Sequence, residues 1–119
     1  MSNIFLDTIN GNSSSRPPVW FMRQAGRILP SYRKLKEKYH FYDMMKNSEL
    51  ASEVTLLPIN DLDVDSAILF SDILVIPDAL GLELVFTKNG PKFTNAITEI
   101  NYNHLNFDPD KLGYIYKNI

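Results

Sequence analysis

Two short apolar segments constrain the fold of this 119-residue chain more than any other feature. Residues 19–22 and 67–70 are apolar on both faces, which is typical of strands buried in a parallel sheet. Between them, the spacing of apolar residues predicts helices over about 30–39, 41–46 and 48–62. A strand, intervening helices and a second strand indicate an α/β fold.

Other local signals surround this unit. A helical turn is expected at 5–9, and the polar, proline-ended stretch 11–18 predicts a loop. After the second segment, Pro77 and Gly81 bracket a predicted turn. Residues 82–86 and 92–94 are expected to pair as a hairpin around Asn89-Gly90, and Asp108-Pro109 to cap a final helix. The order predicts the opening of an α/β barrel in which residues 19–22 and 67–70 are two barrel strands.

Composition narrows the possible chemistry. A net charge of -2 gives no global attraction to nucleic acid or to a membrane surface, so neither is expected as a partner. No apolar run approaches the ~18 residues of a membrane span and no secretory signal begins the chain, which favours a cytoplasmic protein. The absence of cysteine excludes disulfides, thiolate nucleophiles and most zinc sites, and no metal is expected.

The segment Arg23-Gln24-Ala25-Gly26-Arg27 follows the first apolar segment directly. Two guanidiniums on one short loop with a glycine indicate a ligand that carries several carboxylates or phosphates. A surface loop of ion pairs is the alternative. Six of the twelve basic residues lie between 23 and 38, so a local positive patch is expected, or else a solvated helix face.

Several motifs occur together in the chain. Pro-Val-Trp-Phe-Met-Arg-Gln-Ala-Gly-Arg at 18–27 precedes Leu29-Pro30, Glu-Val-Thr-Leu at 53–56, Phe-Ser-Asp-Ile-Leu at 70–74 and Gly90-Pro91. In this order the sequence resembles the uroporphyrinogen decarboxylase family of the haem pathway, from about residue 5 to the last. The resemblance implies a (β/α)8 TIM barrel, of which residues 1–119 would be the N-terminal third of a single domain, incomplete in this chain.

The family's activity is then the expected one. Its enzymes remove the four acetate carboxyls of the tetrapyrrole uroporphyrinogen III to give coproporphyrinogen III, with no cofactor. The resemblance implies a carboxy-lyase that forms a homodimer at full length. Because family site residues on later barrel segments are not in this chain, the isolated chain is expected to be inactive.

The resemblance also implies roles for individual residues. Asp72 would accept hydrogen bonds from the converging pyrrole N–H groups and stabilise the cationic ring. Arg27, close to the reacting ring, would be a proton donor. The substrate-binding residues would be Arg23, Gln24, Ala25, Gly26, Arg27, Phe41 and Asp72. Two simpler alternatives remain: Asp72 as a loop or capping acid, and Phe41 as a core aromatic. Ile28 departs from the tyrosine common at this position of the family.

Other classes of function are also compatible with the residues. One is a non-catalytic module that binds a tetrapyrrole or another anion, and another is one half of a split barrel. The cobalamin-linked methyltransferases that share the fold lack the paired arginines, and Arg23 and Arg27 argue against that class.

Overall fold

The computed structural model describes residues 3–22, 26–95 and 105–119. The chain divides into two compact units: unit 1 comprises Met1–Phe70 together with Asn118, and unit 2 comprises Ser71–Lys117 together with Ile119. Each unit has its own helices and its own buried residues, so each is described separately.

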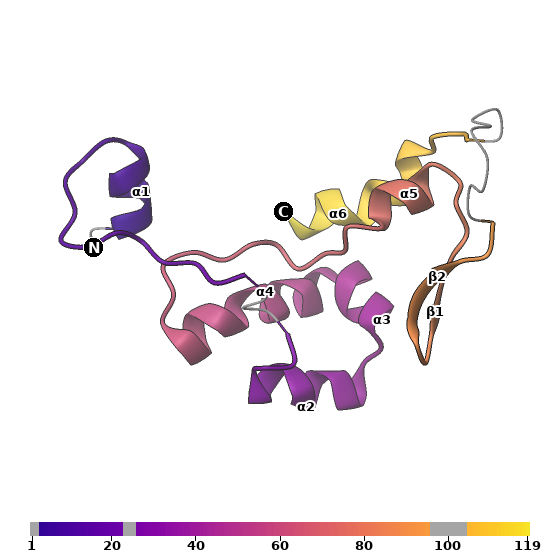
Figure 1. Cartoon of the computed structure of the whole chain (residues 1–119), viewed down its shortest axis with the longest axis horizontal. Helices are drawn as coiled ribbons and strands as arrows, with labels where there is room; N and C mark the ends of the chain where they lie inside the picture. The colour runs from indigo at the N-terminus through magenta and orange to yellow at the C-terminus, as the bar shows by residue number, and fades with distance from the viewer. Residues whose placement is uncertain (1–2, 23–25, 96–104) are drawn as a thin grey trace. The chain divides into compact units, whose positions relative to one another are not determined.

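The described residues of unit 1 form four helices, labelled α1 to α4 in Figure 1. Helix α1 (Ile4–Ile9) is capped by the Asn3 side chain, which accepts hydrogen bonds from two backbone amides of the first turn. Helix α2 (Pro30–Lys38) begins with proline at its first position, where the missing N–H is not needed. Helix α3 (Phe41–Lys46) and helix α4 (Ser48–Leu62) follow, as the apolar spacing predicts.

The core of unit 1 lies where α2, α3 and α4 pack together (Figure 1). Most of its side chains are less than about one-tenth exposed: Leu29, Tyr32, Met44, Met45, Ala51, Val54, Leu57, Val64 and Phe70. The Asn47 side chain accepts a hydrogen bond from the Leu50 amide at 3.0 Å and so caps the first turn of α4. Helix α4 ends at Leu62, and the next residue, Asp63, has a left-handed backbone (φ 53°) that turns the chain out of the helix.

A salt bridge ties the segment before residue 19 to the segment after α4. Arg16 donates two hydrogen bonds to the carboxylate of Asp65, at 2.6 and 2.8 Å. The Val19 amide donates to the same carboxylate at 2.7 Å, and the Asp65 amide donates to the Val19 carbonyl at 2.9 Å. These bonds lower the pKa of Asp65, chiefly through the Arg16 guanidinium.

The prediction of buried strands at 19–22 and 67–70 is wrong for this structure, because neither segment is a strand. A buried strand needs hydrogen-bonded neighbours along its edges, and the described residues place no strand beside either segment. The side chains reflect this: Trp20 is 42% exposed, Phe21 55% and Met22 79%. Val19 is half-buried and Phe70 alone of the second segment is buried.

Unit 2 contains the predicted hairpin. Strand β1 (Leu84–Thr87) pairs antiparallel with strand β2 (Gly90–Phe93), with Thr87 opposite Gly90. The turn therefore consists of Lys88 and Asn89, and Gly90 follows it with φ 111°, a conformation that favours glycine. At the end of the hairpin away from the turn, the Thr94 amide donates to the Glu83 carbonyl at 3.0 Å and extends the pairing of the two strands.

The described part of unit 2 also contains helices. Helix α5 (Val75–Ala79) occupies the place where a turn between Pro77 and Gly81 is expected. The 3-10 helix η1 (Pro109–Leu112) is capped by Asp108 and leads into α6 (Gly113–Asn118), so the final helix begins with a tighter turn. The Asp108 amide donates to the Ala79 carbonyl at 2.8 Å and docks η1 on α5 (Figure 1).

The described residues therefore form a mixed helix and strand structure whose sheet is a single two-stranded hairpin. None of the helices within residues 3–22, 26–95 and 105–119 has the length and apolarity that a membrane crossing requires.

Candidate functional site

The structure describes four of the seven residues predicted to form the site. Gly26 and Arg27 lie together in the turn before α2, and Phe41 begins α3, all in unit 1. Asp72 lies in unit 2. Arg23, Gln24 and Ala25 lie outside the described residues.

The turn that carries Arg27 is anchored just after it. The Leu29 amide donates to the Gly26 carbonyl at 2.9 Å, which closes the turn. The Leu29 side chain is only 1% exposed, so it fixes the turn to the core of unit 1. Arg27 is thereby held on the surface, where its guanidinium can reach a ligand.

The Arg27 guanidinium makes no hydrogen bond or ion pair with any of the residues that the structure describes. The ion pair among those residues joins Arg16 to Asp65. Burial raises the pKa of the Tyr32 hydroxyl, and the positive charge of Arg27 acts in the opposite direction. Arg27 is thus an exposed cation whose donors are available to an anion.

Arg33 contributes to this turn in a way that the sequence did not indicate. Its Nη1 donates to the Arg27 carbonyl at 2.8 Å and to the Ile28 carbonyl at 3.4 Å. The sequence pattern placed Arg33 on a solvated helix face. A search for arginines one or two turns after a candidate loop is the signal that could have found it, since such a side chain reaches back toward the helix N-terminus.

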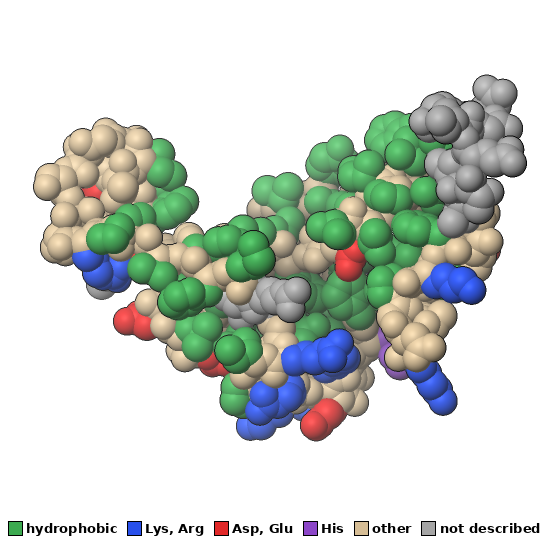
Figure 2. Space-filling view, in the orientation of Figure 1, with side chains coloured by type: hydrophobic (Ala, Val, Ile, Leu, Met, Phe, Trp, Pro, Cys, Tyr) green, Lys and Arg blue, Asp and Glu red, His purple; other side chains and the backbone are tan. Residues whose placement is uncertain are grey.

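The positive patch is present on α2, where Figure 2 shows Lys and Arg side chains gathered in unit 1. A surface hollow of about 360 Å³ is lined by Arg27, Arg33, Lys36 and Glu37. Three cations face one acid in this hollow, so it favours an anionic ligand.

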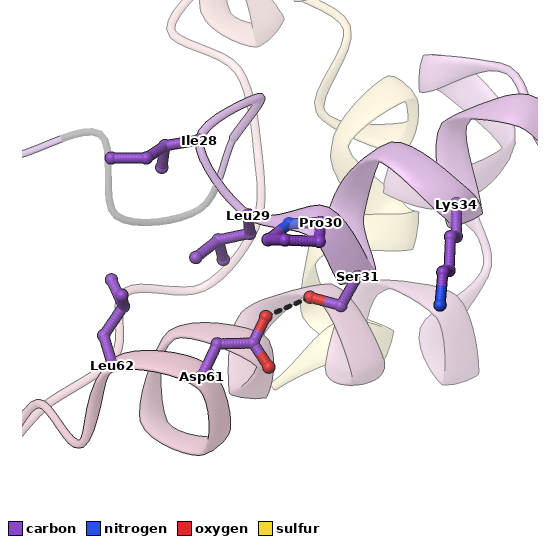
Figure 3. Close-up of a pocket in the computed structure, with 7 residues that line it drawn as sticks. All are labelled: Ile28, Leu29, Pro30, Ser31, Lys34, Asp61 and Leu62. Atoms are coloured by element: carbon purple, nitrogen blue, oxygen red, sulfur yellow. Dashed lines mark hydrogen bonds between the residues drawn. The ribbon is translucent and has the colours of Figure 1, made fainter.

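A second hollow of about 450 Å³ lies beside the same turn, between the start of α2 and the end of α4 (Figure 3). Its lining residues are Ile28, Leu29, Pro30, Ser31, Lys34, Asp61 and Leu62. The Ser31 hydroxyl donates to the Asp61 carboxylate, which links α2 to α4 (Figure 3). This contact supports the helix that carries Arg33.

Phe41 belongs to an aromatic cluster in unit 1. Its half-buried ring meets the ring of Phe70 edge-on, with the two ring centroids 5.4 Å apart. The ring centroids of Tyr32 and Phe70 are 6.0 Å apart. The Phe70 amide donates to the Thr55 hydroxyl at 2.8 Å. Phe41 thus contacts the core, and the cluster holds the residue that precedes Ser71-Asp72.

Asp72 is half-buried and shapes the turn that leads into α5. One carboxylate oxygen, Oδ1, accepts a hydrogen bond from the Leu74 amide at 2.7 Å, as in an Asx turn. Among the described residues, Asp72 makes no further side-chain hydrogen bond or ion pair. A carboxylate has about four acceptor sites, so Asp72 can orient its own turn and still accept N–H donors from a ligand.

The described residues contain no group of three or more His, Cys, Asp or Glu side chains that could hold a metal ion. What unit 1 offers chemically is a set of guanidinium and ammonium groups for carboxylates. Unit 2 offers a carboxylate for N–H donors or for a cation.

The chain matches the family model described as uroporphyrinogen decarboxylase (URO-D) over residues 2–119. It is 43% identical over 122 residues to the uroporphyrinogen decarboxylase of Christiangramia forsetii, covering 99% of this chain and 36% of that protein. It is 57% identical over 96 residues to the uroporphyrinogen decarboxylase of Protochlamydia amoebophila, covering 80% of this chain and 26% of that protein. It is 48% identical over 120 residues to the uroporphyrinogen decarboxylase of Nautilia profundicola, covering 98% of this chain and 35% of that protein.

The chain thus spans about a third of the length of the curated relatives that it matches. The match nevertheless includes the arginine turn, the Phe41 cluster and the Asp72 turn, since it extends over nearly all of the residues. The chain belongs to the uroporphyrinogen decarboxylase family.

Proposed function

We propose that this chain is the N-terminal part of a uroporphyrinogen decarboxylase, a carboxy-lyase of haem and porphyrin biosynthesis. The observation that carries the proposal is the 43% to 57% identity to proteins with that name over 80% to 99% of the chain. In this proposal residues 1–119 are the first third of a (β/α)8 barrel. Residues 19–22 and 67–70 become strands once barrel neighbours supply their hydrogen-bond partners.

The proposed substrate, uroporphyrinogen III, carries four acetate and four propionate groups around a tetrapyrrole ring. Arg23 and Arg27 bind its carboxylates with the planar guanidinium fork, and the backbone of Gln24, Ala25 and Gly26 approaches the same groups. The exposed, unpaired guanidinium of Arg27 among the described residues supports this role. A charge held before the substrate arrives needs no rearrangement when it binds.

A proton delivered to the ring carbon next to the acetate makes the pyrrole ring cationic, and the electron pair left when CO2 departs then flows into that ring and neutralises it. A proton added to the exocyclic carbon completes the methyl group and the ring carbon returns its own proton, so each CO2 is replaced by one hydrogen. The proposed role of Asp72 is to stabilise the cationic ring while it accepts pyrrole N–H hydrogen bonds. The Asx turn supports this role, because the bond from the Leu74 amide orients one oxygen and leaves acceptor capacity on the other. Arg27, close to the reacting ring, is the proposed donor of the proton.

The remaining parts of the proposal concern surroundings and partners. The half-buried ring of Phe41 contacts the macrocycle. The reaction uses no cofactor, since the pyrrole ring itself is the electron sink. The full-length protein is a cytoplasmic homodimer, with neither nucleic acid nor membrane as a partner.

The direct test is turnover of uroporphyrinogen III by the purified 119-residue chain, alone and with the remaining two-thirds of a relative's barrel added. We expect no activity from the chain alone and coproporphyrinogen III from the mixture. We also expect the chain alone to self-associate, because Trp20, Phe21 and Met22 expose apolar surface that a barrel would cover. A compact monomer that converts the tetrapyrrole unaided would contradict the proposal of an incomplete barrel.

The alternative is a module that binds a tetrapyrrole or other anion without catalysis, or one half of a split barrel. The same experiment tests the first alternative, because a mixture that binds uroporphyrin III without turning over uroporphyrinogen III would favour the non-catalytic module. The mass of the chain in its source cell tests the second, since a split barrel requires the two parts to be separate polypeptides there.

A further inference from the structure

We infer that Arg33 is a positioning residue: its guanidinium braces the turn that carries Arg27, so that the Arg27 cation is presented to an anionic ligand in one arrangement. The inference rests on the proposed function, in which Arg27 binds a substrate carboxylate. Arg33 acts through Arg27 and is not itself placed against the reacting atoms.

The bracing contact joins the side chain of α2 to the backbone that precedes it. Arg33 Nη1 lies 2.8 Å from the Arg27 carbonyl and 3.4 Å from the Ile28 carbonyl. Neither carbonyl accepts an amide of the α2 ladder, which begins with the bond from the Arg33 amide to the Leu29 carbonyl at 3.1 Å. The guanidinium therefore provides a donor to two carbonyls that precede α2 and accept no hydrogen bond from its amides.

A second tie makes the turn a closed unit. The Leu29 amide donates to the Gly26 carbonyl at 2.9 Å, and the Leu29 side chain is buried in the core. The backbone around Arg27 is thus held by two contacts: the hydrogen bond from the Leu29 amide to the Gly26 carbonyl, and the contact of the Arg33 guanidinium with the Arg27 carbonyl. With both present, the backbone of residues 26–29 has little freedom to redirect the Arg27 side chain.

The arrangement favours arginine over any other cation at position 33. A guanidinium has five N–H donors in a planar fork, so one Nη1 can serve two successive carbonyls and other donors remain. A lysine ammonium keeps the charge but reaches the carbonyls as a point donor on a flexible stem. The charge of Arg33 also adds to that of Arg27 in the hollow that both line, which strengthens attraction to carboxylates.

The first arm of the test measures the turn itself in the full 119-residue chain. Hydrogen exchange of the Leu29 amide reports opening of the turn, because that amide is bonded to the Gly26 carbonyl. We expect Arg33→Gln to speed this exchange about tenfold and Arg33→Lys to have a smaller effect. Lys38→Gln is the matched control, because it removes one charge from an exposed position of the same helix.

Exchange at Val54, which is buried in α4, distinguishes local from global opening. Bracing predicts that Arg33→Gln leaves Val54 exchange at the wild-type rate. If Leu29 exchange is unchanged in Arg33→Gln, or equally fast in Lys38→Gln, Arg33 does not brace the turn and the inference is wrong. If Leu29 and Val54 accelerate together, Arg33 serves the fold at large, and the inference is again wrong.

The second arm is a double-mutant cycle with uroporphyrin III as the polycarboxylate probe. We expect Arg33→Gln to weaken binding about fivefold when Arg27 is present and by less than twofold in the background of Arg27→Gln. Equal losses in both backgrounds would mean that Arg33 binds the anion directly, which overturns the positioning role. If the wild-type chain binds no probe, the proposed function is in question, while the exchange arm still decides the bracing.

Discussion

Two arginine-bearing segments of unit 1 use the same side chain in opposite ways. Arg16 gives two hydrogen bonds to Asp65 and holds the chain before residue 19 against the chain after α4. Arg27 meets no carboxylate among the described residues and stays exposed. A guanidinium with a bidentate carboxylate partner is committed to the fold, whereas one held without such a partner is available to a ligand.

The two acids extend this contrast. Both carboxylate oxygens of Asp65 are engaged, by Arg16 and by the Val19 amide, and the Asp65 side chain is only 9% exposed. Asp72 uses one oxygen for the Leu74 amide. We therefore expect changes at Arg16 and Asp65 to affect stability, and changes at Arg27 and Asp72 to affect binding and turnover.

The sharpest way to break this contrast is Asp72→Asn. Asparagine keeps the side-chain shape and its carbonyl oxygen can still accept from the Leu74 amide, so folding should change little. Loss of a preorganised charge commonly costs about 2.7 to 4 kcal/mol of transition-state stabilisation, so turnover should fall about a hundredfold. The measurement is uroporphyrinogen III decarboxylation by the chain completed with the rest of a relative's barrel. Wild-type turnover in this variant would remove Asp72 from the mechanism.

Arg27→Lys tests the ligand side of the arginine comparison at constant net charge. An ammonium cannot reproduce the guanidinium fork, so affinity for uroporphyrin III should fall about tenfold in the completed enzyme. Arg23→Lys should act in the same direction, and affinity should also decrease with added salt. Arg16→Lys is the matched control, because Arg16 is already bound to Asp65. Affinities within twofold for both variants at 23 and 27 would identify an ordinary surface loop.

Asp65→Asn tests the structural side. It removes the ion pair with Arg16 and weakens the bond from the Val19 amide, so the melting temperature should fall by about 5 °C. Uroporphyrin III affinity at a temperature where the variant is folded should match that of the wild type. Thermal unfolding followed by circular dichroism gives the first value, and a loss of affinity without a loss of stability would reverse the assignment of this region.

The smallest expected effect is the pH dependence of the same link. The fold lowers the pKa of Asp65 below its usual value of 3.8, mainly through Arg16. Between the lowered and the usual pKa the unfolded chain binds more protons, so the stabilisation is fully present above about pH 4 and is lost as pH falls through the folded pKa. Urea unfolding at pH 2 to 6 should show that the free energy of unfolding decreases less with falling pH in Asp65→Asn than in the wild type. Identical pH profiles for both proteins would show that this pair is not linked to stability.

Local signals predicted most of the helices. Asn47 before α4 and Asp108 before η1 each accept a hydrogen bond from an amide within three residues, and the proline that begins α2 fixes its own φ. These helix starts could therefore be identified without knowing the fold. The hairpin likewise follows from a turn with glycine beside it. Helix α5 was missed because five residues around Pro77 carry too little periodicity to separate a helix from a turn.

The candidate site combines residues indicated by motifs with contacts that only the folded chain makes. The motifs indicated the arginine turn and Asp72 as site residues, and their roles remain predictions. Ile28 is a departure from the tyrosine common in the family. The sequence did not indicate the hydrogen bond from Arg33 to the Arg27 carbonyl, the Ser31–Asp61 link or the Arg16–Asp65 salt bridge, because each joins residues whose contact depends on the fold.

Local patterns were enough to predict most of the helices, the hairpin and the family, because caps, turns and motifs depend on neighbours along the chain. The conformation of residues 19–22 and 67–70, and the pairing of Arg16 but not Arg27 among the described residues, depend on the fold. A strand exists only when another segment supplies its hydrogen bonds, and a charge is paired only when folding brings an opposite charge within reach. Both conditions concern distance in space, which no local pattern of residues records.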